Sequence, residues 1–290
     1  MSDSDNSILL IGESGVGKTH YGAQLLNRLM NGTGKLRMDG AATNLEPFES
    51  AMERLNEGLP ADHTPTTTYV DSLWPISGES GLKAELVWPD YGGEQIKAMS
   101  STRRIPAAWR DRVVGSPAWL LLVRLQQTRV SEDIFSRPLS DITGASVDNR
   151  EVQMSDQARL IELLQMLICI RNESTAKPLV SPRLGVLLSC WDELGAGELE
   201  QPPAQVLERR LPMFSNFIHS IWAEPLVLGL SALGRALTPN NSDMDYITQG
   251  PEHFGYVVLP DGQHTPDLTQ PIQSLLAASA LKVAGQRYES

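Results

Sequence analysis

The chain has 290 residues, of which 41% are hydrophobic and 20% are charged, and its formal net charge is −11 at pH 7. This composition is typical of a globular protein, and the acidic balance works against binding the phosphate backbone of nucleic acid. No apolar run reaches the length of about 18 residues that a membrane span needs, so we expect neither a nucleic-acid partner nor a membrane span.

The first residues are polar and acidic, which predicts that the chain carries no secretory signal. Cys169 and Cys190 each lie within an apolar run. We expect both to be buried, reduced thiols, as is usual in the cytoplasm. The sequence therefore predicts a cytoplasmic protein.

Apolar runs and helical patterns alternate along the chain. Residues 7–11 are continuously apolar, which predicts a strand buried on both faces, and a Gly-rich turn follows. The alternation predicts further strands over 82–88, 118–125, 184–190 and 225–230, and helices over 18–30, 47–56, 156–171, 204–219 and 269–283. This order predicts an α/β fold of the three-layer P-loop NTPase type, with a mostly parallel sheet covered by helices on both faces.

Three polar connections interrupt the alternation, near residues 31–68, 126–154 and 239–253. Connections of this length in a compact domain are usually functional or disordered. The sequence shows no internal repeat and no linker between two cores. We therefore expect residues 1–290 to form a single domain with three insertions.

The Gly-rich turn after the first strand has the spacing of a phosphate-binding loop, G-x-x-x-x-G-K-[ST]. Glycines let successive backbone N–H groups converge on phosphate oxygens, and the following helix adds the positive end of its dipole. We expect Lys18 to contact the β- and γ-phosphates and to act in catalysis, and the Thr19 hydroxyl to bind Mg²⁺. The predicted phosphate-binding residues are Gly12, Glu13, Ser14, Gly15, Val16, Gly17, Lys18, Thr19 and His20.

A second candidate segment begins just after the predicted strand 82–88. Asp90 there is suited to hold Mg²⁺ through water, and the Gly93 N–H to contact the γ-phosphate, so that loss of this phosphate would release the loop. A plain surface turn is the alternative, because Asp-Tyr-Gly-Gly is also good turn chemistry. Thr64 is our first candidate for the Mg²⁺ ligand of the other switch loop, and Thr66 is the second.

Two later segments are suited to recognise a base. Asp192 leaves a buried strand, and its carboxylate can accept from the N1–H and the exocyclic amine of guanine, which adenine cannot match. The backbone N–H groups of Ser231, Ala232 and Leu233, after the last strand, are candidates to meet the guanine O6.

In this order, the four segments resemble the guanine-nucleotide motifs of the translation-factor-related P-loop GTPases, which include Ras-like, Arf-like and Gα proteins. The resemblance covers residues 7–235. The chain is most similar to the bacterial double-GTPase or GTPase-associated-system proteins, through residues 90–94 and the segment Asp267-Leu268-Thr269-Gln270-Pro271. This resemblance implies Mg²⁺-dependent GTP and GDP binding, and work with partner proteins in a bacterial conflict or defence system.

The chain departs from the motifs of these GTPases at two places. Where they have Asn/Thr-Lys-x-Asp, the chain has Ser189-Cys190-Trp191-Asp192, so the Lys that packs on the base is missing, and Trp191 could supply apolar surface instead. Where Ras-like proteins have the Gln that positions water, the chain has Glu94, followed by Gln95. Either is a candidate catalytic residue.

Arg103, Arg104 and Arg110 follow the second segment. They are interpreted as a solvated helix face, with an internal arginine finger as the alternative.

The sequence therefore predicts a GTPase that cycles between GTP and GDP forms and is slow without a partner protein. We expect that partner to bind the switch regions and the polar insertions. Two alternatives stay open: a nucleotide-locked scaffold with little hydrolysis, and a P-loop enzyme that uses ATP.

Overall fold

The structure is a computed structural model that describes residues 7–61, 71–78, 81–88, 94–128 and 155–277. Within these ranges the strands form one nine-stranded sheet in the order β2-β3-β4-β1-β5-β6-β7-β8-β9. The strands are β1 (Ser7–Gly12), β2 (Leu36–Met38), β3 (Ser72–Gly78), β4 (Lys83–Trp88), β5 (Ala118–Arg124), β6 (Arg183–Ser189), β7 (Leu226–Ser231), β8 (Tyr256–Val258) and β9 (His264–Thr265).

The centre of the sheet is parallel. β1 pairs in parallel with β4 and β5, and β5, β6 and β7 continue the parallel pairing. The edge strands β2 and β3 on one side, and β8 and β9 on the other, pair antiparallel. The prediction of a mostly parallel sheet is confirmed, and the carboxyl ends of the five central strands all lie at one edge.

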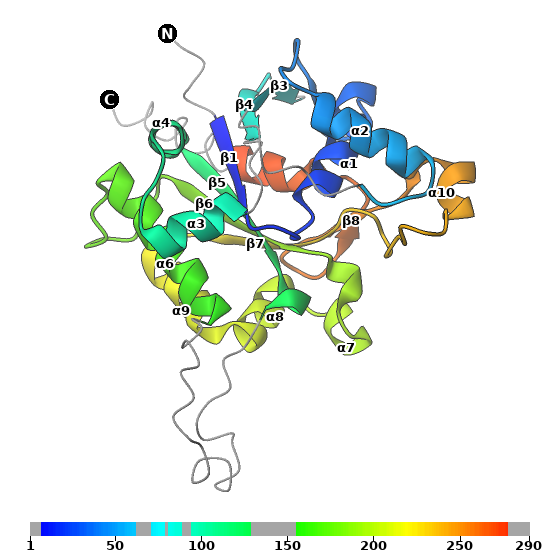
Figure 1. Cartoon of the computed structure of the whole chain (residues 1–290). Helices are drawn as coiled ribbons and strands as arrows, with labels where there is room; N and C mark the ends of the chain where they lie inside the picture. The colour runs from blue at the N-terminus through cyan, green and yellow to red at the C-terminus, as the bar shows by residue number, and fades with distance from the viewer. Residues whose placement is uncertain (1–6, 62–70, 79–80, 89–93, 129–154, 278–290) are drawn as a thin grey trace, which may run out of the picture.

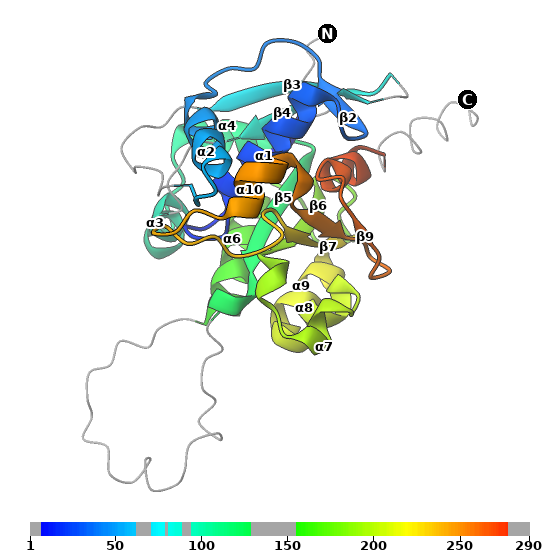
Figure 2. The ribbon, with the colours of Figure 1, turned by 90° about the vertical axis from the view of Figure 1, so that its right-hand side faces the viewer.

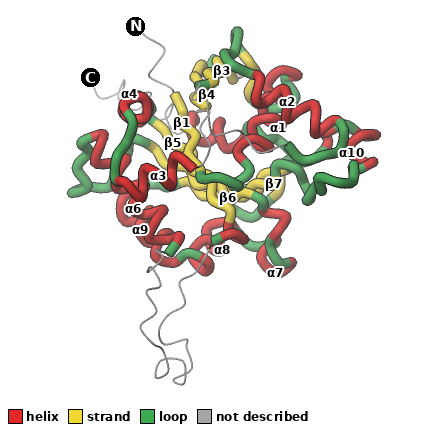
Figure 3. The backbone as a smooth tube through the Cα atoms, viewed as in Figure 1, coloured by secondary structure: helices red, strands yellow, loops and turns green. Residues whose placement is uncertain are grey.

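Helices cover both faces of the sheet, as predicted (Figures 1 and 3). The described helices are α1 (Lys18–Asn31), α2 (Glu46–Asn56), α3 (Glu94–Thr102), α4 (Ala107–Gly115), α6 (Asp156–Arg171), α7 (Ala196–Leu199), α8 (Pro203–Arg210), α9 (Pro212–Ile221) and α10 (Met244–Gln249). Short 3₁₀ helices are η2 (Leu125–Gln127), η4 (Trp191–Glu193) and η5 (Pro251–His253), and a last helix runs from residue 270 to residue 277, where the description ends.

The two faces of the sheet bury two separate sets of apolar side chains. Ile8 and Leu10 of β1 pack in the core with α1 and the last helix, whereas Leu9 and Ile11 pack in the core with α3, α4, α6, α8 and α9. Because alternate residues of a strand point to opposite faces, a strand covered on both sides must be apolar throughout. This explains why the continuous apolar runs predicted the central strands correctly.

Two features of the elements differ from the predictions. The helix expected over 204–219 is divided into α8 and α9, because Pro212 lacks the backbone N–H that an unbroken helix would need and instead begins α9. The antiparallel strands were not predicted. β3 contains Pro75, which argues against a strand, and β8 and β9 are only three and two residues long.

The polar insertion predicted over 239–253 is folded into α10 and η5 rather than being an open loop. α10 lies beside α1 and α2 (Figure 2), and its N-terminus is capped by Asp243, whose carboxylate accepts from the N–H groups of Asp245 and Tyr246. The insertion near 31–68 contains β2 and the predicted α2. Most of the insertion near 126–154 lies outside the described residues.

None of the helices in the described ranges combines the length and the apolar character that a bilayer crossing requires. Both cysteines are free. The expectation that both are buried is wrong for Cys169, which is exposed because it lies on the outer side of α6, while Cys190 is half-buried.

Candidate nucleotide-binding site

The Gly-rich loop joins β1 to α1 and has the backbone that its glycines predict. Gly15 and Gly17 have φ angles of 79° and 81°, in the left-handed region that side chains with a Cβ disfavour. At Gly12, a Cβ would lie 2.9 Å from Cγ2 of Val16. Gly17 is also the N-cap of α1, so no side chain covers the start of this helix from that position.

Lys18 lies across this loop. Its Nζ donates to the carbonyl oxygens of Gly12 and Glu13, at 2.8 and 2.7 Å. Burial lowers the pKa of Lys18 to about 8, and the nearby Glu13 carboxylate acts in the opposite direction. A buried ammonium beside left-handed glycines and a helix N-terminus fits the phosphates of a nucleotide. The negative phosphates would stabilise the positive charge of Lys18, which burial disfavours.

Two arginines contact the loop from outside. Arg159 of α6 binds the Glu13 carboxylate with two hydrogen bonds, at 2.5 and 2.8 Å, and pairs with Asp156 at 2.7 Å. Arg124, at the end of β5, donates to the carbonyl oxygen of Gly15 at 2.9 Å. Sequence reasoning missed both arginines, because no local pattern marks a partner more than 100 positions away along the chain.

The predicted base-recognition residues lie together at the same sheet edge. Asp192 follows β6 and Ser231 ends the neighbouring parallel strand β7. The hydroxyl of Ser231 donates to Oδ1 of Asp192 at 2.5 Å and accepts from the N–H of Gly234 at 2.8 Å. The carboxylate is therefore held directly beside the loop that begins with Ser231, Ala232 and Leu233.

Trp191 does not face a base. Its side chain is fully buried, its Nε1 donates to the carbonyl of Leu199 at 3.4 Å, and a Cβ on Gly229 would lie 2.7 Å from its ring. The prediction that Trp191 supplies apolar surface to the nucleotide is therefore wrong, because the ring packs under β7 as part of the core. Cys190 takes the position of the family's Lys, and its Sγ lies 3.6 Å from where a Cβ would stand on Gly17.

The ring of His20, the last of the predicted phosphate-binding residues, contacts the chain near residue 61. Its Nε2 accepts from the backbone N–H of Ala61 at 2.9 Å, so the ring is neutral. Burial and, as the smaller cause, the positive charge of Arg124 lower the pKa of His20 to about 4. The ring of His20 therefore supports the chain at residue 61, just before the predicted switch Thr64, and the contact of His20 with phosphate stays a prediction.

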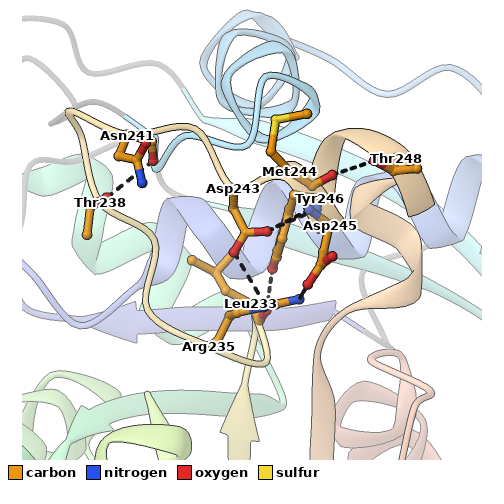
Figure 4. Close-up of polar contacts among 9 residues, drawn as sticks. All are labelled: Leu233, Arg235, Thr238, Asn241, Asp243, Met244, Asp245, Tyr246 and Thr248. Carbon is orange, nitrogen blue, oxygen red and sulfur yellow. Dashed lines mark hydrogen bonds and ion pairs between the residues drawn. The ribbon is translucent and has the colours of Figure 1, made fainter.

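The folded insertion holds the loop that follows the predicted base contacts (Figure 4). The hydroxyl of Tyr246 in α10 donates to the carbonyl oxygen of Leu233. Arg235 pairs with Asp245 at 3.0 Å and with Asp243 at 3.5 Å. These contacts fix the loop at residues 233–235 to α10, and no sequence motif pointed to them.

Several predicted site residues cannot be placed. Thr64, Thr66, Asp90 and Gly93 lie outside the described residues. Glu94 begins α3 and Gln95, which follows it, is half-buried. In the described ranges, no group of three or more acidic, His or Cys side chains could hold a metal ion. The Mg²⁺ ligands and the residue that positions water remain predictions.

The fold and the phosphate loop define a P-loop nucleotide-binding protein of the GTPase class. A model of the Double-GTPase 1 family matches residues 9–275, and the chain belongs to this family. This confirms the family resemblance seen in the motifs, and it makes the chain a GTP-binding P-loop protein.

Two solved structures are also similar to this chain. A bacterial selenocysteine-specific elongation factor, EF-Sec, is 12% identical with a TM-score of 0.33 over 78% of this chain and 25% of its own. The signal recognition particle receptor SRb-GTP/SRX complex from Chaetomium thermophilum is 16% identical with a TM-score of 0.40 over 80% of this chain and 92% of its own. The chain thus spans about a quarter of the elongation factor. No curated protein matches the sequence.

Proposed function

We propose that this chain hydrolyses GTP to GDP with Mg²⁺ and that its two nucleotide forms signal to a partner protein. The observation that carries this proposal is one sheet edge with two kinds of group. The phosphate loop with Lys18 follows β1, and Asp192 with the loop after Ser231 follows β6 and β7. A nucleotide at this edge would have its phosphates at the first group and its base at the second.

Separate residues would bind the phosphates, the base and Mg²⁺. Lys18 would exchange its two carbonyl contacts for phosphate oxygens and become fully charged on doing so. Asp192 would accept hydrogen bonds from guanine while the Ser231 hydroxyl donates to Oδ1 of Asp192. Bound Mg²⁺ would neutralise charge on the phosphates, with Thr19 as a ligand and Asp90 and Thr64 as further candidates.

We expect slow hydrolysis by the chain alone. Transfer of a phosphoryl group to water depends on positioning the water, and Glu94 stands where Ras-like proteins have Gln. A partner that orders Glu94 or Gln95 would raise the rate.

Support for partner binding comes from α10. Met244 and Ile247, three residues apart and hence on one face of the helix, are 66% and 45% exposed. This surface belongs to the same insertion that holds the loop after Leu233. A partner on α10 would therefore act beside the base-recognition loop.

We place this activity in the cytoplasm, in a bacterial conflict or defence system.

Single-turnover phosphate release, with affinities measured by titration calorimetry, tests the proposal. We expect GTP to bind at least ten-fold more tightly than ATP, because only guanine matches Asp192, and phosphate to be released from GTP. Tight GTP binding without phosphate release would favour the nucleotide-locked scaffold. Equal affinities for ATP and GTP would favour the ATP-using enzyme.

A further inference from the structure

Arg124 ends a strand that is otherwise buried. The six preceding residues of β5 have no exposed side chain, and Arg124 is the first residue of the strand to reach the loop edge of the sheet. Its Nη1 donates to the Gly15 carbonyl oxygen at 2.9 Å, and its Nε donates to Oε2 of Glu193 at 2.8 Å. Its Nη2 donates to the other oxygen of Glu193. All three nitrogens of the guanidinium are therefore used.

The two partners of Arg124 belong to different halves of the nucleotide site. Gly15 lies in the phosphate loop, whereas Glu193 directly follows Asp192 in η4. About a quarter of each of the two side chains, Arg124 and Glu193, is exposed, so solvent screens the pair less than it would on the surface. One cation thus joins the loop that would hold phosphates to the loop that would hold the base.

The position that carries Lys in the family motif holds no cation here. Cys190 stands there, in the left-handed conformation, with its Sγ beside Gly17. The positive charge between the two loops comes instead from the neighbouring strand β5, through a side chain 66 positions earlier in the sequence.

We propose that Arg124 is the residue that positions the phosphate loop against the base loop. The inference rests on the proposed nucleotide site. A planar guanidinium that binds a carboxylate through Nε and Nη2 has a fixed direction for its remaining Nη1 donor. The Gly15 carbonyl is therefore held at a set distance and angle from Glu193, and so from Asp192. A nucleotide that spans both loops would leave slowly only while this spacing is kept.

The test is the dissociation rate of a fluorescent GDP, chased with excess GDP in a stopped-flow instrument. We expect Arg124→Ala to release the probe at least ten-fold faster than the unchanged protein. Arg124→Lys should be intermediate, because one ammonium cannot keep both the two-bond contact with Glu193 and the contact with Gly15. Glu193→Gln should also be intermediate, because it keeps the shape but removes the charge that orients the guanidinium.

Arg210→Ala is the matched control. Arg210 also binds a carboxylate, that of Glu198, with two hydrogen bonds, at 2.8 and 2.6 Å, but these residues belong to α8 and α7. Its loss should leave the dissociation rate within two-fold of the unchanged protein. A second readout separates positioning from general stability: the rise in melting temperature on adding saturating GDP should shrink in Arg124→Ala and stay the same in Arg210→Ala.

Dissociation from Arg124→Ala within two-fold of the unchanged protein would overturn the inference, as would an equal acceleration in Arg210→Ala. If Arg124→Ala does not fold, the dissociation rates of Arg124→Lys and Glu193→Gln replace it in the test. Rates within two-fold of the unchanged protein for both variants would then overturn the inference. If the unchanged protein does not bind the GDP probe, the proposed function fails and this inference with it. If it binds the probe but the Arg124 and Glu193 variants release it at the normal rate, only this inference fails.

Discussion

The ammonium group of Lys18 is bonded to two loop carbonyls, and burial lowers its pKa to about 8. A phosphate would raise this pKa again, because a bound anion stabilises the positive charge of the ammonium group. The two glycines in the left-handed conformation leave room for that anion without a Cβ in the way.

We expect Lys18→Ala to weaken GTP binding at least ten-fold, or by about 1.4 kcal/mol, because it removes the mobile cation of the loop. Titration of a fluorescent GTP analogue measures this. Unchanged affinity would mean that the loop does not bind the triphosphate.

Asp192 gives a prediction about the base. Asp192→Asn replaces an acceptor by a donor, so GTP should bind more weakly and xanthosine triphosphate should become relatively favoured. Competition between the two nucleotides for the same fluorescent probe measures the preference. If GTP keeps its affinity and xanthosine triphosphate gains nothing, the base is recognised elsewhere.

His20 gives a prediction about pH. In the folded protein His20 stays neutral down to about pH 4, whereas in the unfolded chain it takes up a proton near pH 6.5. The unfolded state therefore binds more protons between these values, and the free energy of unfolding should fall as the pH drops from 6.5 to 4. The part due to His20 should be about 3 kcal/mol.

His20→Gln is the matched variant, because an amide oxygen can accept from Ala61 without titrating. Urea unfolding of both proteins from pH 7 to pH 4 isolates the effect, since the carboxylates contribute equally to both curves. The free energy of unfolding of the variant, relative to that of the unchanged protein, should rise as the pH falls. If the unfolding free energies of the two proteins change in parallel with pH, the lowered pKa of His20 is contradicted.

The folded insertion places α10 next to the base loop. α10 is tied to Leu233 through Tyr246 and to Arg235 through two carboxylates. On its other side, the carbonyl of Gly58 accepts from the N–H of Asp243 at 2.9 Å, so α10 also contacts the end of α2. A contact made on this insertion would therefore reach both the base loop and the segment that leads to Thr64.

A nucleotide switch predicts a difference in backbone protection. Residues 58–70 and 90–100 should exchange amide hydrogens more slowly with a GTP analogue than with GDP, since contacts to the γ-phosphate exist only in the first state. Hydrogen exchange on the two forms measures this, with β5 as an internal reference that should not change. Equal protection of both segments would refute the switch and favour the scaffold.

At the scale of the whole molecule, one sheet with two buried faces sets the site. Because β1, β5, β6 and β7 are parallel, their carboxyl ends bring together four loops from distant parts of the chain. The antiparallel strands extend this sheet on both sides without moving that edge.

The central strands, the phosphate loop and the helix after it could be predicted from local sequence alone. These follow from local rules: strands covered on both faces must be continuously apolar, and a loop that closes around phosphate needs glycines at fixed spacing. The predicted helix 156–171 also follows such a rule, because Ser155 directly before it caps α6 with a hydroxyl that accepts from the N–H of Ala158.

Which side chains face the site depends on long-range packing and could not be predicted from local sequence. Trp191 was predicted to face a base, but a strand end does not show from its own residues which way its next side chain turns. Here the left-handed Cys190 begins the turn, and the space under Gly229 accepts the ring. The roles of Arg124 and Arg159 arise in the same way, because their partners come close only when the sheet has brought distant loops to one edge.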